Sequence, residues 1–222
     1  RILVDGDKMP GARWFPDARL NYAENMLAHC EARGDEDAIV FRGEDQVAYR
    51  LSWTELHDQV SVLAQAMRET DISAGDRIGG YMPNMPETIV AMLAAASIGA
   101  VWSSCSPDFG VQGVLDRFGQ IEPSILFTVD GYFYNGKAHD LTAKVSEIMA
   151  DLPSVSRVIV VPYVNAEPDI SNLPRAELIA EFTGNFTPRE IEFEQLPFDH
   201  PLYVMYSSGT TGAPKCIVHG AG

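Results

Sequence analysis

The sequence of 222 residues has few cysteines, few positive charges and no long uninterrupted apolar run. Its three cysteines, Cys30, Cys105 and Cys216, lie far apart and form no C-x-x-C pair. This spacing predicts neither a disulfide framework nor a zinc site and favours a reducing, cytoplasmic setting. We expect Cys105 and Cys216 to be buried, unreactive thiols. The longest apolar stretch, residues 89–102, is too short to span a bilayer.

Positive charge is scarce, since 16 Lys and Arg residues stand against 31 Asp and Glu residues, for a net charge of −15. Surfaces that bind nucleic acid or anionic membranes need clustered Lys and Arg, so we expect neither partner. A small polyanionic ligand is not excluded, because main-chain N–H groups bind phosphate without any net positive charge. The apolar content of 46% is that of a folded protein with a sizeable core.

Strand-like and helix-like patterns alternate along most of the sequence. Ser52 and Glu55 form a capping box that is expected to begin the first long helix. Later apolar strands alternate with amphipathic or apolar helices over short links. The strands are expected at residues 38–41, 47–51, 77–82, 101–104, 124–129 and 155–161. The alternation predicts an α/β fold with a mostly parallel sheet flanked by helices on both faces.

Two stretches carry a weaker pattern. Residues 20–30 are expected to form one helix, from apolar residues at helical spacing. Residues 165–200 hold eight acidic residues and two arginines, and are interpreted as a solvated connection with a short helix near 176–182. An apolar strand is then expected at 201–206 and another at 216–219.

The segment between these last two strands carries the clearest chemical signal. Small hydroxyl residues and two glycines precede a lysine; the candidate residues are Ser207, Ser208, Gly209, Thr210, Thr211, Gly212 and Lys215. Glycines let the main chain approach a ligand closely, and hydroxyl and N–H groups can surround phosphate oxygens. The pattern indicates a polyphosphate-binding loop, and the alternative is a Ser/Thr/Gly-rich surface linker.

The spacing separates this loop from two better-known nucleotide motifs. A Walker A loop reads G-x-x-x-x-G-K-[ST] and leads into a helix, whereas this loop reads G-x-x-G-x-x-K and leads into a strand. No strand is followed by G-x-G-x-x-G, which disfavours a dinucleotide-dependent oxidoreductase.

Residues 206–215 resemble the phosphate-loop signature of the adenylate-forming superfamily, which includes acyl-CoA synthetases, peptide-synthetase adenylation domains and luciferases. Segments 14–25 and 81–87 are similar to the short-chain acyl-CoA synthetases, a branch that contains acetyl-, propionyl- and acetoacetyl-CoA synthetases. Segments 102–110 and 130–137 resemble the branch members that act on acetoacetate in particular.

This resemblance implies a ligase that joins a short acid to CoA by way of an acyl-adenylate, using ATP and Mg²⁺. The loop residues would hold the β- and γ-phosphates, with Ser207 and Thr210 as hydroxyl contacts and Lys215 as an electrostatic contact. The resemblance further suggests that Lys137 contacts a CoA phosphate, and that Asp108, Phe109 and Gly110 line the path of the pantetheine arm. The alternatives are a solvated lysine and the start of the next helix. His219 is interpreted as a structural histidine.

The resemblance also implies an organisation. Residues 1–30 correspond to the amino-terminal segment of the branch and residues 31–222 to the first part of its AMP-binding domain. The catalytic lysine, the metal ligands and the acyl pocket are expected further along a longer protein, so we expect the 222 residues to be inactive alone. The open alternatives are an acetyl- or propionyl-CoA synthetase and a non-catalytic nucleotide-binding remnant.

Overall fold

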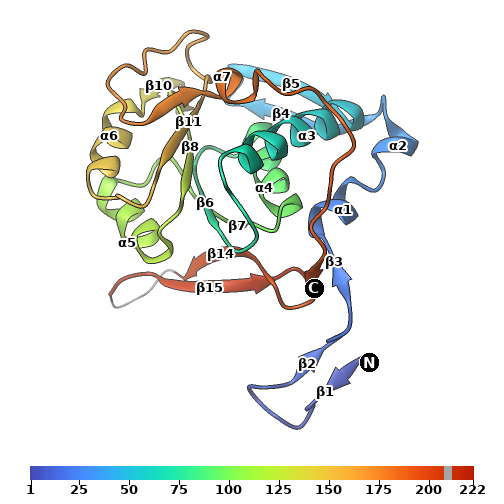
Figure 1. Cartoon of the computed structure of the whole chain (residues 1–222). Coiled ribbons are helices and arrows are strands. Elements are labelled where there is room, and N and C mark those ends of the chain that lie inside the picture. The colour runs from blue at the N-terminus through green and yellow to red at the C-terminus, as the bar shows by residue number, and fades with distance from the viewer. Residues whose placement is uncertain (208–211) are drawn as a thin grey trace.

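A central sheet forms the core of the computed structural model, which describes residues 1–207 and 212–222. In this described part, seven strands follow the order β12-β11-β8-β6-β7-β14-β15, all parallel except for β15, which pairs antiparallel with β14 (Figure 1). The bounds are β6 Arg77–Tyr81, β7 Val101–Cys105, β8 Ile125–Val129, β11 Arg157–Val161, β12 Ala176–Leu178, β14 Pro201–Ser207 and β15 Lys215–Gly220. The predicted fold class is confirmed.

Helices cover both faces of this sheet. In Figure 1, α3 (Trp53–Glu69) and α4 (Pro86–Ser97) pack together on one side, and α5 (Val111–Ile121) and α6 (Thr142–Ala150) on the other. The expected capping box begins α3, with Ser52 and Glu55 each bonding the other's main chain. All five residues of β8 are buried, as in a strand covered on both faces. None of the helices described is long and apolar enough to traverse a lipid bilayer.

The expected single helix over residues 20–30 is wrong. The structure has a strand β3 (Arg19–Leu20), a helix α1 (Tyr22–Leu27) and a short helix α2 (Cys30–Arg33). Asn21 separates β3 from α1, because its main chain is extended and its Oδ1 accepts hydrogen bonds from the N–H groups of Ala23 and Glu24. An asparagine cap begins a helix at the next residue, and this signal is stronger than the apolar spacing that precedes it.

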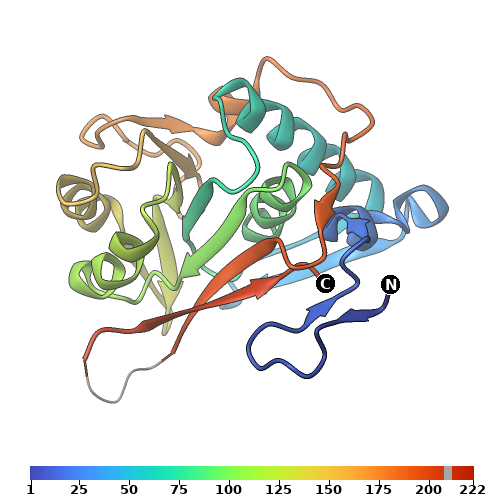
Figure 2. The same cartoon turned by 60° about the horizontal axis from the view of Figure 1, so that its bottom comes forward.

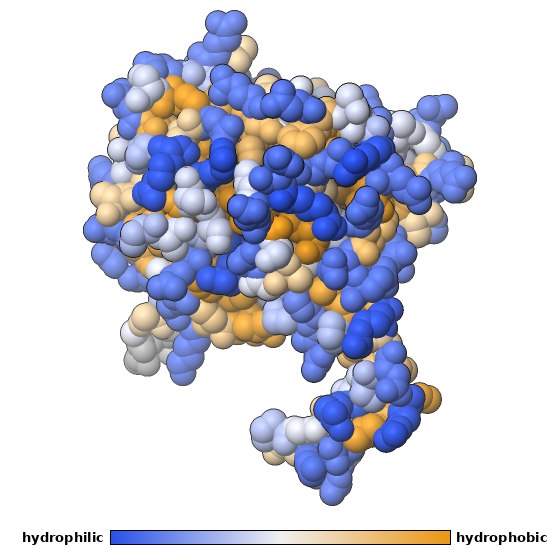
Figure 3. Space-filling view, viewed as in Figure 1, coloured by the Kyte–Doolittle hydropathy of each residue, from blue (hydrophilic) through white to orange (hydrophobic). Residues whose placement is uncertain are grey.

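In the described part of the chain, three antiparallel hairpins lie outside the central sheet. The hairpin of β4 (Asp37–Gly43) and β5 (Val47–Ser52) was predicted. The hairpin of β1 (Leu3–Val4) and β2 (Arg13–Trp14) was not, and it forms a separate lobe beside the main body (Figure 3). The third hairpin, β9 (Gly131–Tyr134) and β10 (Lys137–Asp140), was also missed.

The turn of this third hairpin has a recognisable sequence. Asn135 and Gly136 occupy its two central positions and both have positive φ angles, of 52° and 71°. Asn-Gly is the preferred pair for a two-residue hairpin turn of this kind. The dipeptide was therefore a usable signal for β9 and β10.

The acidic connection 165–200 is more ordered than expected. It contains β12 followed directly by α7 (Ile179–Thr183), so the first residues of the expected helix are a strand. Residues 187–192 then lie across α3, whose side chains bind their main chain. Ser61 Oγ donates to the Arg189 carbonyl at 2.6 Å, and Arg68 donates to the Glu192 carbonyl at 2.8 Å. The segment ends in β13 (Leu196–Pro197), which pairs with β3.

Candidate functional site

The predicted phosphate loop is carried by two long paired strands. Ser207, the last residue of β14, lies opposite Lys215, the first residue of β15. Figure 2 shows this hairpin extending beyond the rest of the sheet. Ser208, Gly209, Thr210 and Thr211 lie outside the described residues. Gly212 follows them with a φ of +106°, a conformation that a side chain disfavours.

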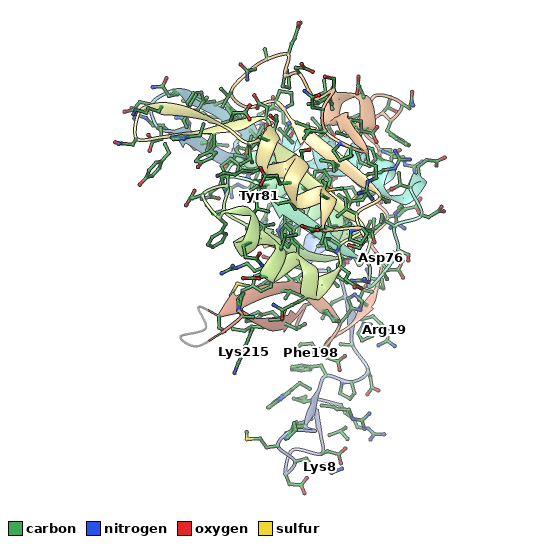
Figure 4. All side chains as sticks on the ribbon, turned by 90° about the vertical axis from the view of Figure 1, so that its left-hand side faces the viewer. Lys8, Arg19, Asp76, Tyr81, Phe198 and Lys215 are labelled. Carbon is green, nitrogen blue, oxygen red and sulfur yellow. The ribbon has the colours of Figure 1, made fainter. Side chains whose placement is uncertain are left out.

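Lys215 and Cys216 begin the returning strand and are exposed. In Figure 4 the Lys215 side chain points away from the body of the protein. The expectation that Cys216 is buried is wrong, because β15 is the outermost strand of the sheet and most of its residues face solvent. The Cys216 thiol lies 3.5 Å from Oε1 of Gln120, on α5.

Helix α5 contacts both strands that carry the loop. The side-chain amide of Gln120 donates to the Pro214 carbonyl at 2.8 Å, just before β15. One turn earlier, the guanidinium of Arg117 lies 5.7 Å from the ring centroid of Tyr206, just before Ser207. Residues three apart on a helix share a face, so one side of α5 supports the base of the loop.

Tyr206 is fixed from the sheet side as well. Its hydroxyl lies 3.0 Å from Oγ of Ser103 on β7, and that Oγ donates to the carbonyl of Val204 at 2.9 Å. Burial raises the pKa of the Tyr206 hydroxyl, which therefore stays neutral at physiological pH. The start of the phosphate loop is thus joined to the centre of the sheet.

The second group of predicted residues lies in the loop after β7. Asp108 is exposed and accepts a hydrogen bond from Ser106 Oγ at 3.0 Å. Phe109 is 38% exposed, and Gly110 caps the start of α5, as the alternative interpretation of this run expects. The hydroxyl of Tyr81, at the carboxyl end of β6, holds the loop by donating toward the carbonyls of Pro107 (3.0 Å) and Phe109 (2.6 Å).

Arg117 brings this loop together with the phosphate-loop strands. Its guanidinium carbon lies 4.3 Å from the ring centroid of Phe109, which belongs to the loop after β7. The same carbon lies 5.7 Å from the ring centroid of Tyr206, which belongs to β14. Its Nη1 donates to the Gly113 carbonyl one turn earlier in α5, at 2.7 Å. Cys105 lies nearby at the end of β7 and is buried, as expected, and burial raises the pKa of its thiol to about 12.

Lys137 lies in a different place. It is exposed at the start of β10, opposite Tyr134. Figure 1 shows this hairpin at the opposite end of the molecule from β14 and β15. The structure therefore does not bring Lys137 together with Ser207 or Lys215.

The hairpin that carries Lys137 is fastened by a buried carboxylate. Asp130 is 2% exposed, and its two oxygens accept from the N–H groups of Tyr163, Val164 and Asn165 at 2.7–3.0 Å. The Asn165 side chain adds a fourth donor at 2.8 Å. Asp130 thereby joins the end of β8, where the hairpin begins, to the loop after β11.

No metal site is built by the part of the chain that the structure describes, because no three His, Cys, Asp or Glu side chains are grouped there. The described residues therefore offer no ready-made set of Mg²⁺ ligands.

Four supporting residues were not predicted: Tyr81, Arg117, Gln120 and Asp130. Most of their partners are distant in sequence, and the spacing of apolar residues within one element does not predict such contacts. The only available signal was the helical spacing of Arg117 and Gln120 on a helix next to the candidate loop.

A family model described as AMP-binding enzyme matches residues 27–222, so the chain belongs to this family of adenylate-forming proteins. Its relatives include the acetoacetyl-coenzyme A synthetase of Rhizobium meliloti (strain 1021), 54% identical over all of this chain and 34% of the relative. The acetoacetyl-CoA synthetase of Rattus norvegicus is 49% identical over 94% of this chain and 32% of its own length.

A solved structure gives the same relationship. The acetoacetyl-CoA synthetase from Streptomyces lividans superposes with a TM-score of 0.92 and 46% identity, over 100% of this chain and 33% of that one. A malonamoyl-CoA synthetase of Penicillium aethiopicum is 41% identical over 96% of this chain. The chain thus spans about a third of the length of the relatives it matches.

Proposed function

We propose that this chain is the phosphate-binding first part of an acid–thiol ligase that forms acetoacetyl-CoA from acetoacetate, ATP and CoA. The observation that carries the proposal is the Ser/Thr/Gly/Lys loop between the paired strands β14 and β15 in a chain 54% identical throughout to an acetoacetyl-CoA synthetase. In this proposal residues 1–30 are the branch's amino-terminal segment and residues 31–222 the first part of the AMP-binding domain.

The chemistry proceeds in two half-reactions. The acetoacetate carboxylate attacks the α-phosphorus of ATP, forming the acyl-adenylate and releasing pyrophosphate. The CoA sulfur then attacks the acyl carbon, the bond to the AMP oxygen breaks, and AMP leaves. The hydroxyl and N–H groups of residues 207–212, with Lys215, hold the β- and γ-phosphates so that the α-phosphorus faces the carboxylate, which is catalysis by positioning and charge stabilisation.

CoA has two candidate contact regions in this proposal. Asp108, Phe109 and Gly110 line the path of the pantetheine arm, which the linkage of their loop to the phosphate-loop strands through Arg117 supports. Lys137 contacts a CoA phosphate from the β9–β10 hairpin. In this proposal the Mg²⁺ ligands and the catalytic lysine belong to residues outside this chain. The proposed location of the protein is the cytoplasm.

A second candidate function differs only in the acid. The malonamoyl-CoA synthetase at 41% identity has a similar first third and a name that specifies a different acid. In this proposal the acid is selected by residues that this chain does not contain, and acetate, propionate and malonamate are the alternatives to test.

The experiment is acid-dependent exchange of pyrophosphate into ATP by the complete product of the gene. Acetoacetate, acetate, propionate and malonamate are compared by kcat/KM, and thioester formation is then followed with CoA. A clear preference for acetoacetate supports the proposal, and a preference for another acid replaces it. Nucleotide binding without turnover of any acid would favour the non-catalytic alternative. The 222-residue chain, assayed in parallel, is expected to be inactive.

A further inference from the structure

The described surroundings of the Arg117 guanidinium include two aromatic rings and a main-chain carbonyl. The guanidinium lies between two aromatic rings, 4.3 Å from the centroid of Phe109 and 5.7 Å from that of Tyr206. Both distances are within the range of about 6 Å at which a cation is attracted to an aromatic face. The side chain is half-buried, and Nη1 bonds the Gly113 carbonyl.

No acidic side chain among the residues that the structure describes neutralises the charge of Arg117. Within the described residues its guanidinium makes no ion pair with a carboxylate, although the chain carries 31 of them. By contrast, Arg157 on β11, next to the edge strand β12, pairs with Glu177 at 2.7 Å. A half-buried cation without a carboxylate retains a positive potential at its site.

This charge lies at the base of the phosphate loop. Tyr206 immediately precedes Ser207, and its hydroxyl contacts Ser103 in the sheet. The ring is therefore held on one side by β7 and on another by Arg117, which also contacts Phe109 in the loop after β7. A movement of the Arg117 side chain would remove one of the contacts that hold the Tyr206 ring next to the first residue of the loop.

We propose that Arg117 is a positioning residue for the phosphate loop: it fixes Tyr206, and so Ser207, for binding the polyphosphate of the substrate, and its unpaired charge favours that anion. The inference rests on the proposed function, because it assigns the loop to a polyphosphate. It predicts that loss of the guanidinium weakens the use of ATP and leaves the use of the acid unchanged.

The test uses the complete gene product with Arg117→Met, Arg117→Lys and the control Arg157→Met, all checked for native thermal unfolding. In pyrophosphate exchange, Arg117→Met should raise the KM for ATP at least fivefold and change the KM for the acid less than twofold. Arg117→Lys keeps the positive charge but lacks the planar guanidinium, so its KM for ATP should lie between those of wild type and Arg117→Met. Arg157→Met should match wild type. An Arg117→Met variant that folds with an unchanged KM for ATP overturns the proposal.

A double-mutant comparison separates positioning from general damage. If Arg117 acts through Tyr206, the variant Arg117→Met/Tyr206→Leu should raise the KM for ATP no more than the worse single variant. If the double variant raises the KM for ATP by the product of the two single increases, Arg117 does not act through Tyr206. If Arg117→Met does not fold, Arg117→Lys decides, because an unchanged KM for ATP in that variant also overturns the proposal.

A direct binding measurement keeps this inference separate from the proposed function. Titration calorimetry with ATP and with inorganic pyrophosphate needs no acid and no turnover. If wild type activates none of the acids, the proposed function fails, while a fivefold weaker Kd in Arg117→Met still supports the role of Arg117. Equal Kd values in wild type and Arg117→Met count against that role, whatever the activity.

Discussion

The side-chain amide of Asn21 donates a hydrogen bond to the main-chain carbonyl of Glu194 at 2.9 Å, across 173 residues of sequence. The same amide also lies within hydrogen-bonding distance of the carbonyls of Ala96 (2.9 Å) and Ser97 (3.1 Å) at the end of α4. Asn21 is 2% exposed, and its oxygen caps α1. One buried side chain therefore holds together the start of α1, the end of α4 and the segment before β13.

Replacing Asn21 by alanine should destabilise the fold strongly. The change removes the cap of α1 and leaves buried carbonyls without a donor, for a loss of about 3 kcal/mol in the free energy of unfolding. Urea unfolding followed by circular dichroism measures it. Asn25→Ala, at an exposed position of the same helix, is the control and should change stability by less than about 0.5 kcal/mol. Equal midpoints for the two variants would contradict the assignment.

Replacing Ser61 by alanine should loosen residues 187–192 and little else. Ser61 Oγ donates to the Arg189 carbonyl and accepts from the Arg189 N–H at 3.0 Å, and the change removes both bonds. We expect a loss of about 1–2 kcal/mol and faster amide exchange confined to this segment. Hydrogen-exchange mass spectrometry measures it, with Ser146→Ala on α6 as control. Uniformly faster exchange throughout the chain would argue against a local fastening.

Burial of the Cys105 thiol should make the free energy of unfolding decrease at alkaline pH. Burial raises its pKa from 9.0 to about 12, so above pH 9 the unfolded chain loses this proton and the native chain keeps it. The contribution of this thiol to the free energy of unfolding is fully present below pH 9. It falls as the pH rises toward 12, by at most about 1.4 kcal/mol per pH unit. Cys105→Ala should therefore flatten the decline measured by urea unfolding between pH 9 and 11. The exposed Cys216→Ala should not, and identical slopes for the two variants would refute the mechanism.

The outer edge of β15 should make the 222-residue chain associate with itself. This six-residue strand ends the sheet, and its Ile217 and Val218 side chains are 43% and 58% exposed. An exposed apolar edge strand pairs readily with another chain. Sedimentation velocity should show concentration-dependent oligomers that Ile217→Lys reduces, while Val40→Lys, at an exposed position of β4, should leave them unchanged. A wild-type chain that stays monomeric at high concentration would count against this expectation.

The fold was predictable where the residues of one element determine it. The capping box of α3 and the buried strand β8 are local patterns, and the structure confirms both. The course of residues 187–192 was not predictable, because their main chain is bound by Ser61 and Arg68 from a helix more than a hundred residues earlier. The acidic composition of that segment says nothing about such partners.

The candidate site divides in the same way. The two strands that carry the loop followed from the apolar residues on each side of it, and Ser207 and Lys215 lie opposite one another at its base. The role of Arg117 did not follow, because its contact to Tyr206 depends on β7 and β14 being neighbours in the sheet. The exposure of Cys216 was misjudged because an apolar strand pattern does not show whether the strand lies at an edge.

The pairing of β3 with β13 has a consequence for the order in which the chain folds during synthesis. Leu20 lies opposite Leu196, so β3 has no strand partner until the chain has been made as far as Leu196. Strand β14 likewise joins β7 only after a long delay along the chain. Helices α3 to α6 and strands β6, β8 and β11 can assemble on the ribosome before these contacts form, and the unpaired edges of β3 and β7 remain open to chaperones in the meantime.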